Sequence, residues 1–180
     1  MPSIAFIHPF IYRYPRGIER YVLSLSQALG HRKVNVDILT WRWPNPLPIE
    51  TLNERVRIHT YYTARYYAAN LIMLSFFYHL FINNYDMIFV NFADYGEAIP
   101  LKLVRWIKGQ AFSVVLHFPS DQVPHRYMSF QKTGLARLAT HVVAVSHIVG
   151  RQAEQAFRRP VHVIYNGVDT RIFSPNASFR

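Results

Sequence analysis

A single glycine begins the segment whose residues are best suited to binding a charged ligand. The stretch "HPFIYRYPRGIER" follows a short apolar run, and Gly17 stands where apolar residues begin to recur at helical spacing. A glycine there lets a ligand approach bare backbone, and the free N–H groups of a helix start favour an anion. Arg13, Arg16 and Arg20 add positive charge. Because Gly17 stands alone, the fingerprint G-x-G-x-x-G is missing, which argues against an NAD site; a glycine that only eases a turn is the other interpretation.

A histidine after the fifth apolar run is the candidate for acid–base or polar chemistry. His117 ends the run "VVLH" and is followed by "FPSD", so its imidazole lies at the end of an expected strand, beside a loop. There it can meet a substrate and titrate near neutral pH. The chain holds nine histidines, and none of the others stands at a spacing from serine or aspartate that by itself declares a triad or a metal site. A bystander role for His117 is the alternative.

The stretch "YNGVDTRIFSP" near residue 170 is crowded with residues that form turns. Asn166 and Gly167 suit a positive φ, and the side chain of Asp169 can bond to the backbone two residues on. An ordinary tight turn explains this pattern without any chemistry.

These candidate residues need elements that hold them at one edge of a sheet. Nearly continuous apolar runs alternate with segments of helical spacing, which is typical of parallel strands covered by helices on both faces. We expect strands at residues 4–8, 34–41, 56–62, 86–92, 111–118, 140–146 and 161–165. We expect helices from Gly17 to a stop at Gly30, at 65–82 and 97–107, and after an N-cap at Ser146. The prediction is an α/β fold with a doubly wound parallel sheet.

Ligands of such sheets bind beyond the carboxyl ends of the strands. The loops to search therefore follow His8, Asn91, Phe118 and Ser146.

Composition restricts the class of protein. A chain of 180 residues, 51% hydrophobic and 17% charged, suits one folded domain and excludes disorder as its main state. A formal net charge of +10 predicts an anionic neighbour, which could be nucleic acid, lipid headgroups or a phosphorylated substrate. The lack of cysteine excludes disulfides and thiolate metal sites, and the start "MPSIAFIHPF" does not resemble a signal peptide. We therefore expect an intracellular protein.

The segment at residues 65–82 is apolar nearly all round. A helix that spans a membrane needs about 20 apolar residues with few charges. Arg65, Asn70, Ser75 and His79 interrupt this segment. The pattern therefore favours a buried helix, or one covered by a partner or by the membrane surface.

Four motifs together resemble one family. The segments "PRGIERYVLSLSQAL", "VVLHFPSD", "HVVAVSHIVGRQ" and "VIYNGVDTRIFSP" look like the amino-terminal half of a family 4 glycosyltransferase of the GT-B fold. They stand in the expected order, and the resemblance covers essentially the whole chain. The last motif is the most specific, because family members usually carry I-P-N-G-V-D before a phenylalanine and a proline. This chain keeps Phe173 and Pro175 but has Tyr165 where proline is common.

The resemblance implies two Rossmann-like domains, of which the first mainly holds the acceptor and the second holds the nucleotide sugar. Residues 1–165 would be the acceptor-binding domain, and residues 166–180 would begin the interdomain linker. The C-terminal nucleotide-sugar domain, absent from this chain, would be supplied in cis or by a second chain. The chain alone is then expected to be inactive.

The resemblance also assigns roles to single residues. Gly17 matches the second glycine of the family's G-G-x-E loop, whose amides face the donor diphosphate, and Glu19 matches its glutamate. Arg16 replaces the first glycine, and its guanidinium could meet the diphosphate or an anionic acceptor. His117 matches the histidine that lies beside the transferred sugar in many relatives, and it is the expected catalytic residue. The expected substrate-binding residues are Arg16, Gly17, Asp94, Ser146 and Asn166, and the expected structural residues of the motifs are Glu19, Gly167 and Asp169.

The implied reaction is retaining transfer of a sugar from a nucleotide diphosphate sugar to a hydroxyl, without a cofactor or a metal. The basic, aromatic composition and the apolar segment suit a lipid-linked acceptor or an envelope polysaccharide precursor, handled in the cytoplasm and at the inner face of the membrane. Two other classes stay open: a non-catalytic binding or regulatory subunit, for which Arg16 is the main argument, and a basic phosphate- or nucleic-acid-binding domain. No RNP, helix-turn-helix or zinc-finger signature is present, so we do not expect nucleic acid as the partner.

Overall fold

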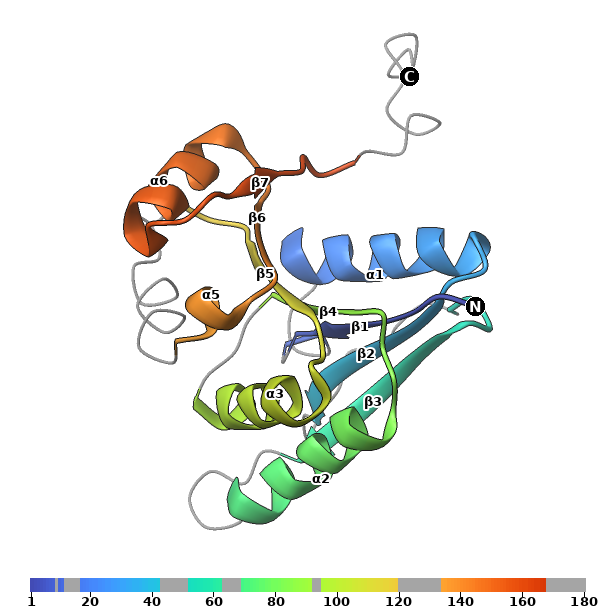
Figure 1. The fold of residues 1–180 in the computed structure, drawn as a ribbon. Coiled ribbons are helices and arrows are strands. Elements are labelled where there is room, and N and C mark those ends of the chain that lie inside the picture. The colour runs from blue at the N-terminus through green and yellow to red at the C-terminus, as the bar shows by residue number, and fades with distance from the viewer. Residues whose placement is uncertain are drawn as a thin grey trace, which may run out of the picture.

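A computed structural model of the chain places its strands in one parallel sheet (Figure 1). The structure describes residues 1–8, 10–11, 17–42, 52–62, 69–91, 95–119 and 134–167. Within these ranges seven strands pair in the order β3-β2-β1-β4-β5-β6-β7. Their bounds are Ser3–Ile7 for β1, Asn35–Arg42 for β2, Val56–Tyr62 for β3, Met87–Val90 for β4, Phe112–Leu116 for β5, His141–Ala144 for β6 and His162–Val163 for β7. The expected doubly wound α/β fold is confirmed.

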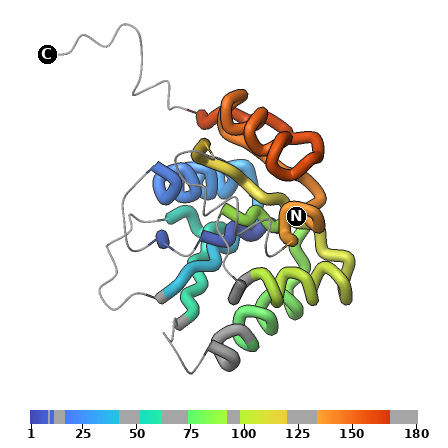
Figure 2. The backbone as a smooth tube through the Cα atoms, turned by 90° about the vertical axis from the view of Figure 1, so that its left-hand side faces the viewer, coloured from blue at the N-terminus to red at the C-terminus, as the bar shows by residue number. Residues whose placement is uncertain are grey.

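Helices cover both faces of this sheet. The described helices are α1 (Gly17–His31), α2 (Ala69–Ile82), α3 (Tyr95–Lys108), α5 (Leu135–Leu138) and α6 (His147–Phe157). Helix α1 lies on one side of β1, β2 and β3, and α2 and α3 lie side by side on the other (Figures 1 and 2). This arrangement follows from the chain's crossovers, because a right-handed connection that moves one way along the sheet lies on the opposite face from one that moves the other way.

The strands are apolar because both of their faces are buried. In β1, Phe6 joins a core cluster beneath α1, whereas its neighbours Ala5 and Ile7 join a larger cluster under α2, α3 and α5. All five residues of β5 are buried. Successive side chains of a strand point to opposite faces of the sheet. Whether a residue has an odd or an even position in its strand therefore decides which helix its side chain meets.

Two elements differ from the sequence-based expectation. Helix α1 continues through Gly30, the expected stop, to His31, and the left-handed backbone occurs later, at Lys33 with a φ of 64°. Gly30 is needed inside the helix because the helix packs closely there against Asn53 and Val56. Strand β3 spans Val56–Tyr62, the seven residues that the sequence predicts. Helix α5, of four residues, was not predicted.

Helix α2 begins at Ala69, and its described side chains, from Leu74 to Ile82, are buried on one side of the helix only. Phe76 and Leu80 lie in the core, whereas Leu74 and Tyr78 are exposed. No helix in the described residues is long and apolar enough to cross a membrane. Of the expected alternatives, a fully buried helix is therefore not what the described part of α2 shows, because Leu74 and Tyr78 face away from the core.

The close contact at Gly30 leads to a prediction about stability. A Cβ added at Gly30 would lie 2.9 Å from Oδ1 of Asn53 and 3.1 Å from Cγ2 of Val56. The Asn53 oxygen is held by the backbone N–H of Arg55 at 3.0 Å, so it cannot move away freely. We expect Gly30→Ala to lower the free energy of unfolding by about 1–2 kcal/mol, despite the better helix propensity of alanine. Urea denaturation measures this change.

Gly17→Ala is the matched control. No heavy atom of the described residues lies within 4 Å of a Cβ built at Gly17, so we expect its free energy of unfolding to equal or slightly exceed that of the parent. Equal stability of the two variants would show that the packing at Gly30 is looser than the structure indicates.

Candidate active site

Three polar side chains gather where adjacent central strands end. His8 follows β1, Asn91 follows β4 and His117 follows β5. The backbone hydrogen bonds of the sheet extend to His8 and Asn91. The N–H of His8 donates to the carbonyl of Leu39 at 3.1 Å, and the N–H of Asn91 donates to the carbonyl of Ile7 at 3.0 Å. By the alternation of each strand, all three point to the face that α1 covers. The carboxyl edge of the sheet therefore presents polar groups to the start of α1.

His8 and Glu19 form a buried polar pair. The Nε2 atom of His8 lies 3.0 Å from Oε1 of Glu19, and the two side chains are 1% and 8% exposed. Glu19 lies in the first turn of α1, where the helix dipole stabilises a carboxylate. Nδ1 of His8 is buried without a hydrogen-bond partner among the described residues. The pair joins the end of β1 to the start of α1.

His117 is held by two neighbours. Its Nε2 lies 2.9 Å from Oδ1 of Asn91, and because that oxygen can only accept, Nε2 carries the proton. The ring of Tyr21, one turn along α1 from Gly17, meets the imidazole edge to face with centroids 5.0 Å apart. Burial raises the pKa of the Tyr21 phenol, so it stays neutral in the physiological range. Nδ2 of Asn91 is buried and has no partner in the part of the chain that the structure describes.

Ser146 caps α6, as the sequence predicts. Its Oγ accepts a hydrogen bond from the backbone N–H of Val149 at 3.3 Å. The preceding Val145 N–H donates to Leu116 at 3.2 Å, which places this helix start beside the end of β5. In this structure the Ser146 hydroxyl is therefore used to cap the helix.

The end of the described chain lies beyond β7. Asn166 and Gly167 are exposed, and neither has the positive φ that their sequence suggests. Tyr165 sets its ring against His147, the first residue of α6, with centroids 5.6 Å apart. The chain thus leaves the sheet beside the start of α6.

Three predicted site residues, Arg16, Asp94 and Asp169, lie outside the described residues. Of the other predicted residues, Gly17, Glu19 and His117 come together around the start of α1. The residues that the sequence analysis did not single out are His8, Tyr21 and Asn91. The sequence held a signal for two of them, because His8 and Asn91 are polar residues that each end an apolar run.

Comparison with known proteins identifies the family and the fold. A family model described as Glycosyltransferase Family 4 matches residues 15–172. A search of curated protein sequences finds no match. Among solved structures, Alr3699/HepE from Anabaena, in complex with UDP and glucose, is similar with a TM-score of 0.70 and 19% identity; the match covers 97% of this chain and 48% of that one.

Two further solved structures are similar. Sucrose-phosphate synthase from Thermosynechococcus elongatus has a TM-score of 0.68 and 19% identity, over 98% of this chain and 51% of that one. The lipopolysaccharide outer core galactosyltransferase WaaB has a TM-score of 0.63 and 15% identity, over 93% and 46%. The chain therefore spans about half the length of the structures it matches, and at these identities the likeness concerns the fold.

The pairing of His8 and Glu19 leads to a second prediction. Glu19→Ala leaves the buried imidazole without this partner, so we expect the free energy of unfolding to fall by about 2–3 kcal/mol. Glu19→Gln keeps an oxygen that can accept and should lose about 1 kcal/mol. Glu54→Ala, at an exposed position, is the control and should stay within about 0.5 kcal/mol of the parent. If Glu19→Ala were no more destabilising than the control, the pair would have no role in stability.

Proposed function

Because this chain belongs to glycosyltransferase family 4, we propose that it is the acceptor-side half of a retaining glycosyltransferase. The enzyme would move a sugar from a nucleotide diphosphate sugar to a hydroxyl of a lipid-linked acceptor or an envelope polysaccharide precursor. The observation that carries the proposal is the convergence of His117, Asn91 and Tyr21 beside the start of α1, at the carboxyl edge of the parallel sheet. That edge is where α/β sheets bind their ligands.

The start of α1 is our proposed contact for the donor diphosphate. Gly17 is exposed, and no described heavy atom lies within 4 Å of the position that a side chain would take. A phosphate oxygen can therefore approach the backbone N–H groups there, which the helix dipole makes favourable for an anion. Arg16, which directly precedes Gly17 in the sequence, would add a charged donor.

His117 is proposed to bind and orient the sugar. In the reaction the bond between the anomeric carbon and the diphosphate oxygen breaks, a bond to the acceptor oxygen forms on the same face, and the acceptor's proton passes to the diphosphate. The main task is to stabilise the charge that develops on the leaving diphosphate. Asn91 fixes the orientation of the His117 ring, and its Nδ2, which has no partner among the described residues, offers a donor that a substrate oxygen would satisfy.

A second domain completes the proposed site. The similar structures are about twice as long as this chain, and one of them holds UDP and glucose. We take residues 1–165 as the acceptor-side domain and residues 166–180 as the start of a linker. The donor-binding domain would come in cis or on a second chain, and the reaction would use the nucleotide diphosphate sugar as a substrate, with no cofactor or metal at the transfer site.

Replacement of His117 tests this proposal. In the enzyme complete with its donor-binding domain, we expect His117→Ala to lower kcat/KM by about 100-fold and Asn91→Ala by about 10-fold. The measurement is transfer of labelled sugar from a panel of nucleotide diphosphate sugars to a lipid extract. His162→Ala, at an exposed position on β7, should leave the rate unchanged. Full activity of His117→Ala would remove that residue from the site, and the absence of transfer from every donor would overturn the proposed reaction.

The proposed membrane-bound acceptor is supported by an apolar surface on α2 and α3. These helices pack against each other and expose large apolar side chains on their outer sides. We call this set the α2–α3 apolar patch: Leu74, Tyr78, Phe81, Ile82, Ile99, Leu103, Trp106 and Ile107. Trp106 is 84% exposed, and Lys102, Arg105 and Lys108 lie on the same helix. An apolar and aromatic surface flanked by cations suits the headgroup region of an anionic membrane.

Vesicle binding tests the α2–α3 apolar patch. We expect the protein to sediment with vesicles that contain anionic lipid, less with neutral vesicles, and less as salt rises. Trp106→Ser should weaken the binding to anionic vesicles by about 10-fold, because one large interfacial ring is lost. Tyr165→Ser, at an exposed aromatic that follows β7, the strand at the opposite edge of the sheet from β3, is the control. Equally little sedimentation with both vesicle types would exclude the membrane role.

A further inference from the structure

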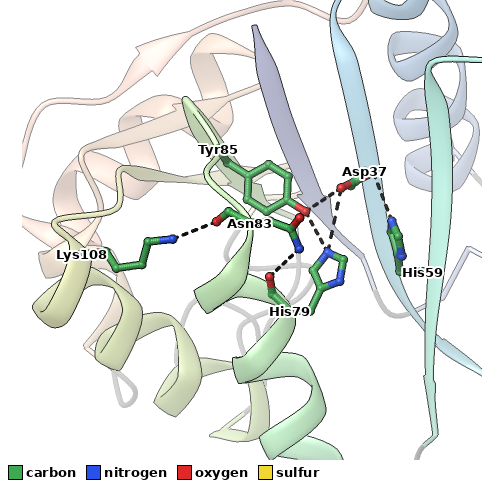
Figure 3. A network of polar contacts seen from close by, with 6 residues as sticks. All are labelled: Asp37, His59, His79, Asn83, Tyr85 and Lys108. Atoms are coloured by element: carbon green, nitrogen blue, oxygen red, sulfur yellow. Dashed lines mark hydrogen bonds and ion pairs between the residues drawn. The ribbon is translucent and has the colours of Figure 1, made fainter. Parts of the chain in front are cut away.

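A second polar cluster lies on the opposite face of the sheet from the candidate active site (Figure 3). Asp37 comes from β2, His59 from β3 and His79 from α2. Asp37 lies between Val36 and Ile38, which pack beneath α1, so alternation turns its carboxylate to the α2 side. The cluster is therefore separate from His8, Asn91 and His117, which face α1.

The three side chains have the composition and spacing of a metal site. One ligand atom from each, the carboxylate oxygen and two ring nitrogens, all lie within 4.8 Å of one another. The Nε2 of His59 is 3.1 Å from Oδ1 of Asp37, and the Nε2 of His79 is 4.0 Å from Oδ2. Ligands of tetrahedral zinc lie about 3.3 Å apart, because Zn–N and Zn–O bonds are about 2.0–2.1 Å. If the ligand atoms moved by well under 1 Å, both measured distances between a ring nitrogen and a carboxylate oxygen would match this spacing.

One atom of the cluster is poorly satisfied by the protein alone. Nε2 of His59 is buried and approaches Oδ1 of Asp37 at 3.1 Å, but among the described residues it makes no contact with the full geometry of a hydrogen bond. The rings of His59 and His79 lie only 4.4 Å apart. A cation between these nitrogens and the carboxylate would give His59 a bond and would balance the charge of Asp37.

Neighbouring groups hold the ligands in place. Tyr85 donates from its hydroxyl to Oδ2 of Asp37 at 2.7 Å, and the Tyr85 hydroxyl oxygen lies 2.8 Å from Nε2 of His79. The end of α2 that carries His79 is tied down, since Asn83 Nδ2 donates to the His79 carbonyl at 2.8 Å and Lys108 donates to the Asn83 carbonyl at 3.0 Å (Figure 3). Such outer contacts orient metal ligands and strengthen binding.

The protonation of two of the ligands agrees with metal binding. Burial lowers the pKa of His79, so its imidazole is neutral near pH 7. Burial alone would raise the pKa of Asp37, but contacts with His59 and Tyr85 outweigh it and lower the pKa, so the carboxylate is ionised. Neutral imidazole and carboxylate are the forms that bind metals. The His59 side chain is 33% exposed, which leaves a route for an ion from solvent.

We propose that Asp37, His59 and His79 bind one zinc ion, with water in the fourth position. Two imidazoles and a carboxylate suit zinc, whereas magnesium prefers oxygen ligands. The ion would link β2, β3 and α2 and would take no part in sugar transfer. It would stabilise the edge of the sheet and the helix that carries half of the α2–α3 apolar patch.

Zinc titration of the protein, stripped of metal with a chelator, tests the proposal. With a chromogenic chelator as competitor, we expect one zinc per chain and a zinc-dependent rise in the midpoint of thermal unfolding. His59→Ala and His79→Ala should each weaken zinc binding by about 100-fold, and Tyr85→Phe by about 10-fold. His162→Ala should bind as the parent does. Magnesium should give no rise in the midpoint.

Two measurements keep the test decisive if an alanine variant fails to fold. Asp37→Asn keeps the shape of the side chain and should lose most of the affinity. Cobalt(II) bound to the parent protein should show the visible absorption of a four-coordinate site, and zinc should displace it. Failure of the parent to bind zinc at one ion per chain, or equal binding by the parent and Asp37→Asn, would overturn the proposal.

Discussion

The parallel pairing of β1 with β2 and β4 is the constraint on which both polar sites depend. Because Ala5 lies opposite Asp37 and Ile88, the parity of the three strands is locked together. This register sends His8 to the side of α1 and Asp37 to the side of α2. A slip of one residue would exchange the two faces, bury Asp37 among the apolar side chains beneath α1, and separate His8 from Glu19. The hydrophobic pattern excludes that slip.

The two polar sites differ in how the fold stabilises them. The pair of His8 and Glu19 is almost fully buried and lies at the start of a helix, where the dipole supports the carboxylate. Asp37 and its histidines are only partly buried, and a tyrosine hydroxyl supports the carboxylate instead. The first arrangement suits a fixed scaffold, and the second leaves the His59 side chain partly exposed to solvent.

Helix α2 shows how a segment that is apolar nearly all round can contribute to the core with only one of its sides. Its inner side contributes Phe76 and Leu80 to the core, and its last turns carry His79 to the polar cluster. Its outer side exposes Leu74 and Tyr78 next to the outer side of α3. Each side of the helix thus meets a different environment, and an amphipathic pattern never develops.

The sequence by itself determined the strands, most of the helices, the Ser146 cap and the family. These features depend on residues close along the chain, where apolar periodicity, cap chemistry and motif spacing can be read directly. Gly30 within α1 and the short α5 were not predictable, because distant packing partners decide them.

The tertiary structure alone decided which polar residues meet. Strand order brings β3, β2 and α2 together, and no local pattern encodes that order, so the joining of His8 to Glu19 and of Asp37 to His59 and His79 required the fold.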